Sequence, residues 1–223
     1  MNNIIVAVMD RNGWNERTDI IIYINTEQKM LQWIPRDLYS NLINNRINAA
    51  YRKGGANLLL DCLKEFNIYA EHCVCVLPLC FDENIKKINT IKVPVDKIMI
   101  FRYPLHRHID IEKGSRIINF LPPYEILQEN RFHEWIGARN YLNQKSVKVI
   151  YPDIDRIKRQ QILLKELLKI NYSFVYSNEH VQGMNENVLE ILKTIDLSWT
   201  IQNIKETDFI SVNINNISGI KYS

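Results

Sequence analysis

The sequence predicts a layered α/β domain whose sheet has mixed strand directions. Three observations support this prediction: isoleucine-rich strand-like runs open the chain, segments with helical spacing alternate with later strand-like runs, and the early runs form a meander. The length of 223 residues and the hydrophobic fraction of 46% suit one compact domain spanning residues 1–223. A charged fraction of 24% excludes a disordered chain.

The first third of the chain predicts a meander followed by a helix and a buried strand. The expected strands are IIVAVM (4–9), DIIIYIN (19–25) and KMLQWI (29–34), and the turn Thr26-Glu27-Gln28 joins the last two. After Gly54-Gly55 an apolar stripe predicts a helix, and CVCVLPL (73–79) follows as a buried strand.

The rest of the chain is expected to contain loops, helices and two further strands. IKVPV (91–95) predicts a strand, and the region from about 102 to 134, which contains Pro122-Pro123, reads as loop-rich. Helical spacing then marks FHEWIGARNYL (132–142) and 153–170, where Pro152 precedes the helix start. The region 180–223 is expected to hold two short helical segments near 185–206 and an edge strand at FISVNI (209–214).

Composition limits the classes of partner. The net charge of +3 and the pI near 8.6 permit an anionic ligand without requiring a nucleic acid, and the four tryptophans are dispersed rather than interleaved with a basic stripe. We therefore expect no nucleic-acid partner, although a nucleic-acid-binding regulator is the third hypothesis, resting on the pI alone. None of the cysteine spacings is C-x-x-C, which favours reduced, buried thiols over a metal site.

No export signal and no run of roughly 18 apolar residues is visible. We expect a soluble protein with no transmembrane segment of its own, located in the cytoplasm or at the membrane periphery.

The helix expected at 153–170 carries one candidate site. Arg156, Arg159 and Gln160 stand at i, i+3 and i+4 and project from one face of its first two turns. Cations at a helix N-terminus oppose the macrodipole, and a bound anion would offset that cost. The alternative is a solvated basic face paired with Asp153 and Asp155.

The ends of the early strands carry a second candidate. Asp10 ends the first strand, Arg17 and Asp19 open the second, and Arg36 and Asp37 follow the third. Such strand ends can meet, which would supply carboxylates for a hard cation and arginines for phosphate. The alternative is structural pairing, such as Arg17 with Asp19 or Arg36 with Asp37.

Four segments in this order resemble a known family. They are RTD (17–19), IPRD (34–37), INAAYRKGG (47–55) and RIKRQQ (156–161). This order is similar to the LytR-CpsA-Psr family, whose members transfer polyprenyl-diphosphate-linked glycopolymers to the bacterial cell wall. The resemblance runs from about Ile4 to Leu168.

The resemblance implies a three-layer α/β/α domain with a mixed central sheet and an apolar lipid-binding groove. It implies that Asp10 and Asp19 are the carboxylates that bind the cofactor Mg²⁺. The diphosphate-contacting group that it implies consists of Arg17, Arg36, Arg156, Arg159 and Gln160.

Three departures separate the chain from the family pattern. Asn143 and Lys145 stand where the family has the arginines of a Y-x-R-x-R segment; Lys145 still supplies a point charge, whereas Asn143 cannot replace a guanidinium. The glycine pair before the KVPVD turn and the N-terminal anchor are missing as well. The chain is then either an intracellular relative or one that has lost the usual reaction.

The first functional hypothesis is a magnesium-assisted phosphotransferase acting on a polyprenyl-diphosphate-linked saccharide, with slow diphosphate hydrolysis as a side activity. An acceptor hydroxyl, of the cell wall or of a saccharide, would attack the phosphorus, with Asp37 as a candidate base. The alternative is a catalytically weakened module that binds polyprenyl phosphate. In both cases membrane contact would come through the lipid substrate.

Overall fold

The computed structural model describes residues 3–10, 13–105, 113–142 and 152–202. The chain divides into two compact units: Met1–Phe81 together with Tyr176–Ser223 form unit 1, and Asp82–Val175 form unit 2. The expectation of a single domain over 1–223 stays a prediction.

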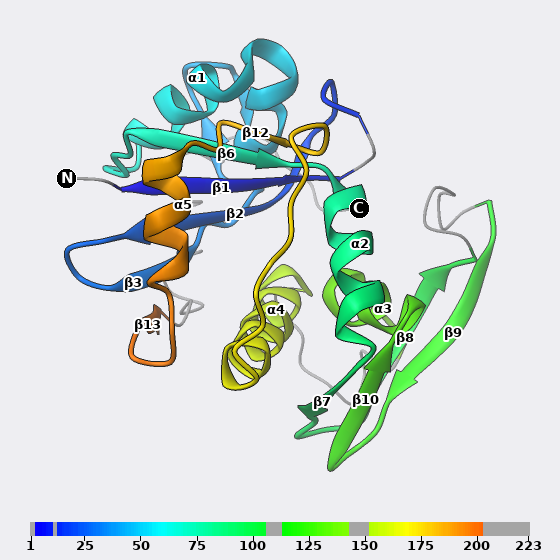
Figure 1. Cartoon of the computed structure of the whole chain (residues 1–223). Helices are drawn as coiled ribbons and strands as arrows, with labels where there is room; N and C mark the ends of the chain where they lie inside the picture. Colours follow the sequence, from blue (N-terminus) through cyan, green and yellow to red (C-terminus); the bar gives the residue numbers. More distant parts are fainter. Residues whose placement is uncertain (1–2, 11–12, 106–112, 143–151, 203–223) are drawn as a thin grey trace. The chain divides into compact units, whose positions relative to one another are not determined.

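Unit 1 is built on a six-stranded mixed sheet with the order β12-β6-β1-β2-β3-β13 (Figure 1). β1 (Ile4–Met9), β2 (Thr18–Asn25) and β3 (Met30–Trp33) form the antiparallel meander, and β6 (His72–Val76) runs parallel to β1. β12 (Val181–Gln182) is antiparallel to β6, and β13 (Thr200–Gln202) is parallel to β3. The predicted fold class, its mixed sheet and the first three strands are therefore confirmed.

One face of this sheet carries the core of unit 1. Ile5, Ala7 and Met9 of β1 point to the same side and are fully buried, because alternate residues of a strand share a face. α1 (Ala50–Lys64) covers this side with Leu59 and Leu63. Gly54 and Gly55 have non-helical dihedral angles, with φ of +69° at Gly55, so the regular helix starts after the glycine pair, as the sequence predicts.

The cysteines belong to this core. Cys62, Cys73, Cys75 and Cys80 are all buried and form no disulfide, which confirms the expectation of buried thiols. The sulfurs of Cys73 and Cys75 lie 3.7 Å apart on one side of β6.

Short elements complete unit 1. β4 (Tyr39–Ser40) and β5 (Asn45–Arg46) pair with each other, a single 3₁₀ turn spans Ile47–Ala49, and α5 (Glu186–Lys193) begins at an Asn185 cap.

Unit 2 contains a two-stranded and a three-stranded antiparallel sheet together with α3 and α4. β7 (Thr90–Pro94) pairs with β10 (Tyr124–Gln128), and β8 (Met99–Pro104) pairs with β9 (Ser115–Phe120) and with β11 (Asn140–Tyr141). α3 (Asn130–Gly137) packs on β10 and on α4 (Pro152–Lys169), and α4 also packs on β7. α2 (Pro78–Ile88) crosses from unit 1 into unit 2.

One predicted strand and one predicted helix in unit 2 are confirmed. IKVPV corresponds to β7, and the helix expected at 153–170 is α4. The core of the unit is aromatic: the rings of Phe101 and Phe120 lie 5.8 Å apart, and those of Phe120 and Trp135 lie 5.0 Å apart, both edge to face.

Four predictions of local structure are wrong. The loop-rich region from about 102 to 134 contains the end of β8, all of β9 and β10, and the start of α3. The helix expected at 132–142 ends at Gly137 because Ala138 is extended, and residues 140–141 form a strand. CVCVLPL is a strand only to Val76, since Pro78 opens α2.

The second short helix expected near 200 is replaced by β13, which pairs with the edge of the meander. The strand expected at 209–214 lies outside the described residues. Within the described part of the chain, no helix is both long and apolar enough to cross a membrane.

Candidate functional site

A β-bulge brings the strand ends of unit 1 together. Val8 of β1 lies opposite Ile20, and Met9 lies opposite Thr18, so Asp19 is an extra residue in β2. The N–H of Asp10 donates to the carbonyl of Arg17 at 2.9 Å, which places both residues at the same end of the pair. Bulges commonly redirect a side chain beside a functional site, and here the redirected side chain is a carboxylate.

Arg36 lies against this carboxylate. Its Nη1 donates to Oδ1 of Asp19 in an ion pair, and its side chain is only 11% exposed. The turn after β3 holds Arg36 there, because Ile34 donates its N–H to the carbonyl of Ile21 at 2.8 Å and Asn48 donates to the carbonyl of Arg36 at 3.1 Å. The IPRD and INAAYRKGG segments thus meet beside Asp19.

One nitrogen of the Arg36 guanidinium has no hydrogen-bond acceptor within the described ranges. Its Nε is buried and makes no hydrogen bond to any residue of the described ranges. A buried donor without an acceptor costs free energy, and an anion that accepted its hydrogen bond would remove that cost.

Asp37 and Arg17 take different places. Asp37 pairs with Arg46 at 3.0 Å, so the alternative of an Arg36–Asp37 pair is wrong. The reason is the turn itself, which directs Arg36 toward the β2 bulge and Asp37 toward the short β4–β5 pair. Arg17 and Asp10 are both exposed beside the bulge.

The two carboxylates suit a hard cation. Mg²⁺ is commonly held by one or two carboxylates together with phosphate oxygens of the substrate, which matches the chemistry of Asp10 and Asp19. No group of three or more His, Cys, Asp or Glu side chains gathers around a point among the residues that the structure describes. The Mg²⁺ assignment itself stays a prediction.

The cationic face of α4 is buried. Arg156 and Arg159 are each 2% exposed, and Gln160 is buried beside them. The alternative of a solvated basic face is therefore wrong. Asp155 pairs instead with Lys97 of the β7–β8 turn at 3.4 Å, because packing against α3 and β7 turns the arginines inward.

Arg159 and Gln160 hold the C-terminal end of α3. Nε of Arg159 donates to the carbonyl of Trp135 at 2.8 Å, and Nη2 donates to the carbonyl of Ala138. Nε2 of Gln160 donates to the carbonyl of Ile136 at 3.1 Å. The last carbonyls of a helix lack intrahelical donors and carry the negative end of its dipole, so a guanidinium there satisfies both.

Aromatic rings enclose this cap. The guanidinium carbon of Arg159 lies 4.8 Å from the centre of the Phe101 ring, and the indole N–H of Trp135 donates back to the carbonyl of Arg159 at 2.8 Å. These contacts give the Arg159 side chain a structural role in unit 2. Lys145 and Asn143 lie outside the described residues.

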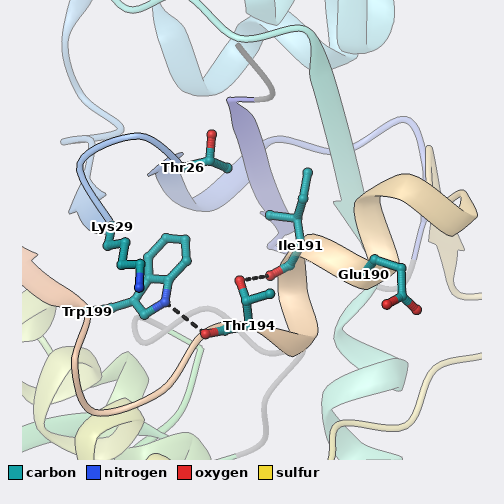
Figure 2. Close-up of a pocket in the computed structure, with 6 residues that line it drawn as sticks. All are labelled: Thr26, Lys29, Glu190, Ile191, Thr194 and Trp199. Atoms are coloured by element: carbon teal, nitrogen blue, oxygen red, sulfur yellow. Dashed lines mark hydrogen bonds between the residues drawn. The ribbon is translucent and has the colours of Figure 1, made fainter.

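A shallow hollow of about 380 Å³ in unit 1 contains none of the predicted site residues. Its lining comes from the β2–β3 turn, α5 and the segment before β13: Thr26, Lys29, Glu190, Ile191, Thr194 and Trp199. Figure 2 shows the Glu190 carboxylate pointing away from the Trp199 indole, whose N–H donates to the Thr194 carbonyl at 2.8 Å. Its polar groups do not converge on one ligand position.

Comparison with known families decides the assignment of the chain. The sequence model described as "LytR_cpsA_psr family" matches residues 1–119, more than half of the chain. The chain belongs to the LytR-CpsA-Psr family. No curated protein matches it at significant similarity.

Solved structures of LytR-CpsA-Psr proteins share this fold. TagT bound to LI-WTA superposes with a TM-score of 0.62 at 16% identity over 91% of this chain and 77% of that one. TagV of B. subtilis gives 0.60 at 20% identity over 92% and 84%. The LytR-CPS2A-psr protein YwtF (TagT) with bound octaprenyl pyrophosphate lipid gives 0.58 at 16% identity over 91% and 76%.

The LytR-CpsA-Psr match separates the predicted site residues into two groups. The segment 1–119 contains the strand-end group of Asp10, Arg17, Asp19, Arg36 and Asp37. The second group lies beyond it and comprises Lys145, Arg156, Arg159 and Gln160.

Sequence reasoning missed the partners of several charges. Arg46, which pairs with Asp37, stands nine residues away across the β4–β5 turn and follows no helical or strand spacing. Glu134 is buried between Arg116 and Arg131, and Arg131 also pairs with Glu125 at 2.8 Å. Of these ion pairs, only the one between Arg131 and Glu134 is indicated by the sequence, through its i, i+3 spacing.

Proposed function

We propose that this protein transfers a saccharide phosphate from a polyprenyl-diphosphate carrier to a hydroxyl acceptor at the strand-end site of unit 1. The observation that carries the proposal is Arg36, whose guanidinium is fixed by Asp19 and whose buried Nε lacks an acceptor among the described residues. A phosphate oxygen is the acceptor that fits a planar guanidinium best.

Family membership and the relatives support the proposed lipid class. One structure of TagT is described with bound octaprenyl pyrophosphate lipid, and another with LI-WTA. A diphosphate attached to a long isoprenoid requires both cationic groups and an apolar surface. Unit 1 offers both next to each other.

The apolar surface begins at the bulge. Ile20, the neighbour of Asp19, lies opposite Val8, and Ile22 lies opposite Val6 on the sheet face away from α1. These four side chains are only partly buried. They support the placement of the isoprenoid along this face, with its diphosphate at Arg36.

The reaction exchanges one phosphorus–oxygen bond for another. The acceptor hydroxyl oxygen forms a bond to the phosphorus that carries the saccharide, the bond from that phosphorus to the bridging oxygen breaks, and polyprenyl phosphate leaves with the bond electrons. Arg17 and Arg36 neutralise the charge on the phosphate oxygens. The hydroxyl proton goes to a base, and Asp37 stays the candidate that the sequence offers, although its carboxylate pairs with Arg46 at 3.0 Å on the side of β4 and β5.

The carboxylates have a separate role. Asp10 and Asp19 would hold Mg²⁺, which when bound supplies positive charge to the diphosphate. Asp19 also fixes Arg36 through their ion pair. The placement of Arg156, Arg159, Gln160 and Lys145 on the diphosphate remains a prediction from the family resemblance.

One observation favours a second function. Arg159 donates to the backbone carbonyls of Trp135 and Ala138, so it serves the C-terminus of α3. With Asn143 in place of a family arginine as well, the chain could bind polyprenyl phosphate without transferring a saccharide.

The test is release of polyprenyl phosphate from a synthetic polyprenyl-diphosphate saccharide supplied in detergent, with acceptor and with or without Mg²⁺. The native chain is compared with Arg36→Ala and with Lys64→Ala, which removes an exposed charge on α1. Magnesium-dependent release that is lost only in Arg36→Ala is the expected result. Tight lipid binding without any release would establish the binding module instead, and equal release by Arg36→Ala and native protein would overturn the site.

A further inference from the structure

The two sheets of unit 2 turn one face toward α3 and α4 and the other face away from them. Phe120 of β9 packs on Trp135 of α3, α3 packs on β10, and α4 packs on β7 (Figure 1). Residues that alternate with this buried set therefore point outward. We call these outward residues of β7, β8, β9 and β10, together with Leu121, the outer strand face.

This face carries large apolar side chains where a solvated strand face is normally polar. Ile117 is 70% exposed and Ile126 is 54% exposed, and Tyr124 and Leu121 are exposed beside them. Single exposed apolar residues are ordinary, but four large ones within residues 117–126 form a patch. Such a patch marks an interaction surface.

The charges on the face are all positive. Strand register places Lys92 opposite Ile126 and Arg102 opposite Ile117. The Nζ of Lys92 lies 3.6 Å from the centre of the Tyr124 ring. The outward positions of the four strands contain no carboxylate among the described residues.

Two carboxylates next to these strands are turned inward. Glu125 lies opposite Val93, on the buried side, and pairs with Arg131 at 2.8 Å. Glu134 is buried against Arg116 and Arg131. These two acidic groups are thus neutralised beneath the strands, and the charged side chains of the outer strand face are both cationic.

We propose that the outer strand face rests on a bilayer surface that contains anionic lipid. Apolar side chains and tyrosine enter the interfacial region, while lysine and arginine reach the lipid headgroups along their aliphatic stems. A second copy of this chain fits less well, because a symmetric contact would gather the cations of both copies in one interface. The surface goes beyond the proposed function, since it lies in unit 2 and requires no polyprenyl lipid.

The experiment is sedimentation of the full chain with phosphatidylcholine vesicles, with and without phosphatidylglycerol. The test variant is the double substitution Ile117→Ser with Ile126→Ser. Its control is Leu42→Ser with Leu197→Ser, two leucines of unit 1 that are 56% and 60% exposed. Because all four side chains are exposed, the variants should fold, which circular dichroism checks.

The native chain and the leucine control are expected to bind vesicles that contain phosphatidylglycerol, and the isoleucine variant to bind about tenfold more weakly. Lys92→Gln with Arg102→Gln should weaken binding at low sodium chloride, and its binding should change less than that of the native chain as sodium chloride rises, because salt screens the attraction that these cations supply. Three results would overturn the proposal: no binding by the native chain, equal losses in the test and control variants, or a dimer in sedimentation equilibrium that the isoleucine variant abolishes. If the vesicle-binding proposal fails, the release of polyprenyl phosphate in detergent should still be observed. The two assays therefore distinguish failure of this proposal from failure of the proposed function.

Discussion

Arg36, in the turn after β3, donates a hydrogen bond to Asp19, the extra residue of a bulge in β2. The contact joins residues 17 positions apart and orients the guanidinium at the strand ends, where the family match and the two carboxylates coincide. It connects the local irregularity of the sheet to the proposed diphosphate site.

The Arg36–Asp19 pair should contribute measurably to stability. A double-mutant cycle with Arg36→Gln and Asp19→Asn is expected to give a coupling energy of about 1 kcal/mol, because the pair is largely removed from solvent. The control cycle uses Lys64 and Asp61, a pair with both side chains about half exposed, where we expect close to zero. Urea unfolding measures both, and equal coupling in the two cycles would refute the structural role.

Loss of the α3 cap should destabilise unit 2. Arg159→Met leaves the carbonyls of Trp135 and Ala138 without their donor and removes the contact with Phe101, at a cost of about 2–4 kcal/mol. The neighbouring Lys158→Met, at an exposed position, should change the free energy of unfolding by less than about 0.5 kcal/mol. Similar unfolding midpoints for both variants would argue against the cap.

Tyr51 should make unit 1 less stable in alkali. Burial raises the pKa of its hydroxyl from 10.0 to about 12. The folded state then holds the proton of Tyr51 more tightly than the unfolded state does. The protonated hydroxyl therefore contributes fully to the free energy of unfolding below pH 10, and this contribution is lost as the pH rises through about 12.

Between pH 10 and 12 the native chain should lose up to roughly 2 kcal/mol of its free energy of unfolding through Tyr51, and Tyr51→Phe should not show this loss. At neutral pH the variant should lose about 1 kcal/mol, since Tyr51 donates to Oε1 of Gln182 at 2.9 Å. The measurement is the urea midpoint against pH for both proteins. Parallel alkaline slopes would contradict the assignment.

Gly183 should tolerate no side chain. Its φ is +79°, and a Cβ there would lie 2.2 Å from the carbonyl oxygen of Cys73 in β6. Gly55 has a similar φ of +69° with open space around it. We expect Gly55→Ala to cost about 1 kcal/mol and Gly183→Ala at least about 2 kcal/mol more. Thermal unfolding of both variants is the check, and equal losses would mean that the backbone at Gly183 can move away.

The sequence predicts the meander and α4 well because their patterns are local. Isoleucine-rich runs separated by polar turns leave little choice for β1, β2 and β3, and the spacing of Ile157, Leu164 and Leu167 predicts a helix. The region 102–134 misled the prediction because Ile117 and Ile126 are apolar at outward positions, which hides the period of two. The sequence predicts a helix in place of β13, because the pairing of β13 with β3 is a tertiary contact that a local pattern does not indicate.

The residue types of the site were predictable, but their partners were not. Arg36 and Asp19 stand in segments that signal chemistry, whereas the bulge that aims Asp19 at Arg36 depends on register. Arg159 shows the same limit. Its spacing from Arg156 indicates one helix face, while its partners belong to the end of α3, which the sequence does not place beside α4.

The most direct test of the central claim is calorimetric titration of polyprenyl diphosphate, without acceptor, into the native chain, Arg36→Ala and Lys64→Ala. A hydrogen bond from a charged group contributes roughly 1.5–3 kcal/mol, so Arg36→Ala should bind at least about tenfold more weakly while Lys64→Ala binds like the native chain. Equal affinity for all three proteins would contradict the placement of the diphosphate at Arg36.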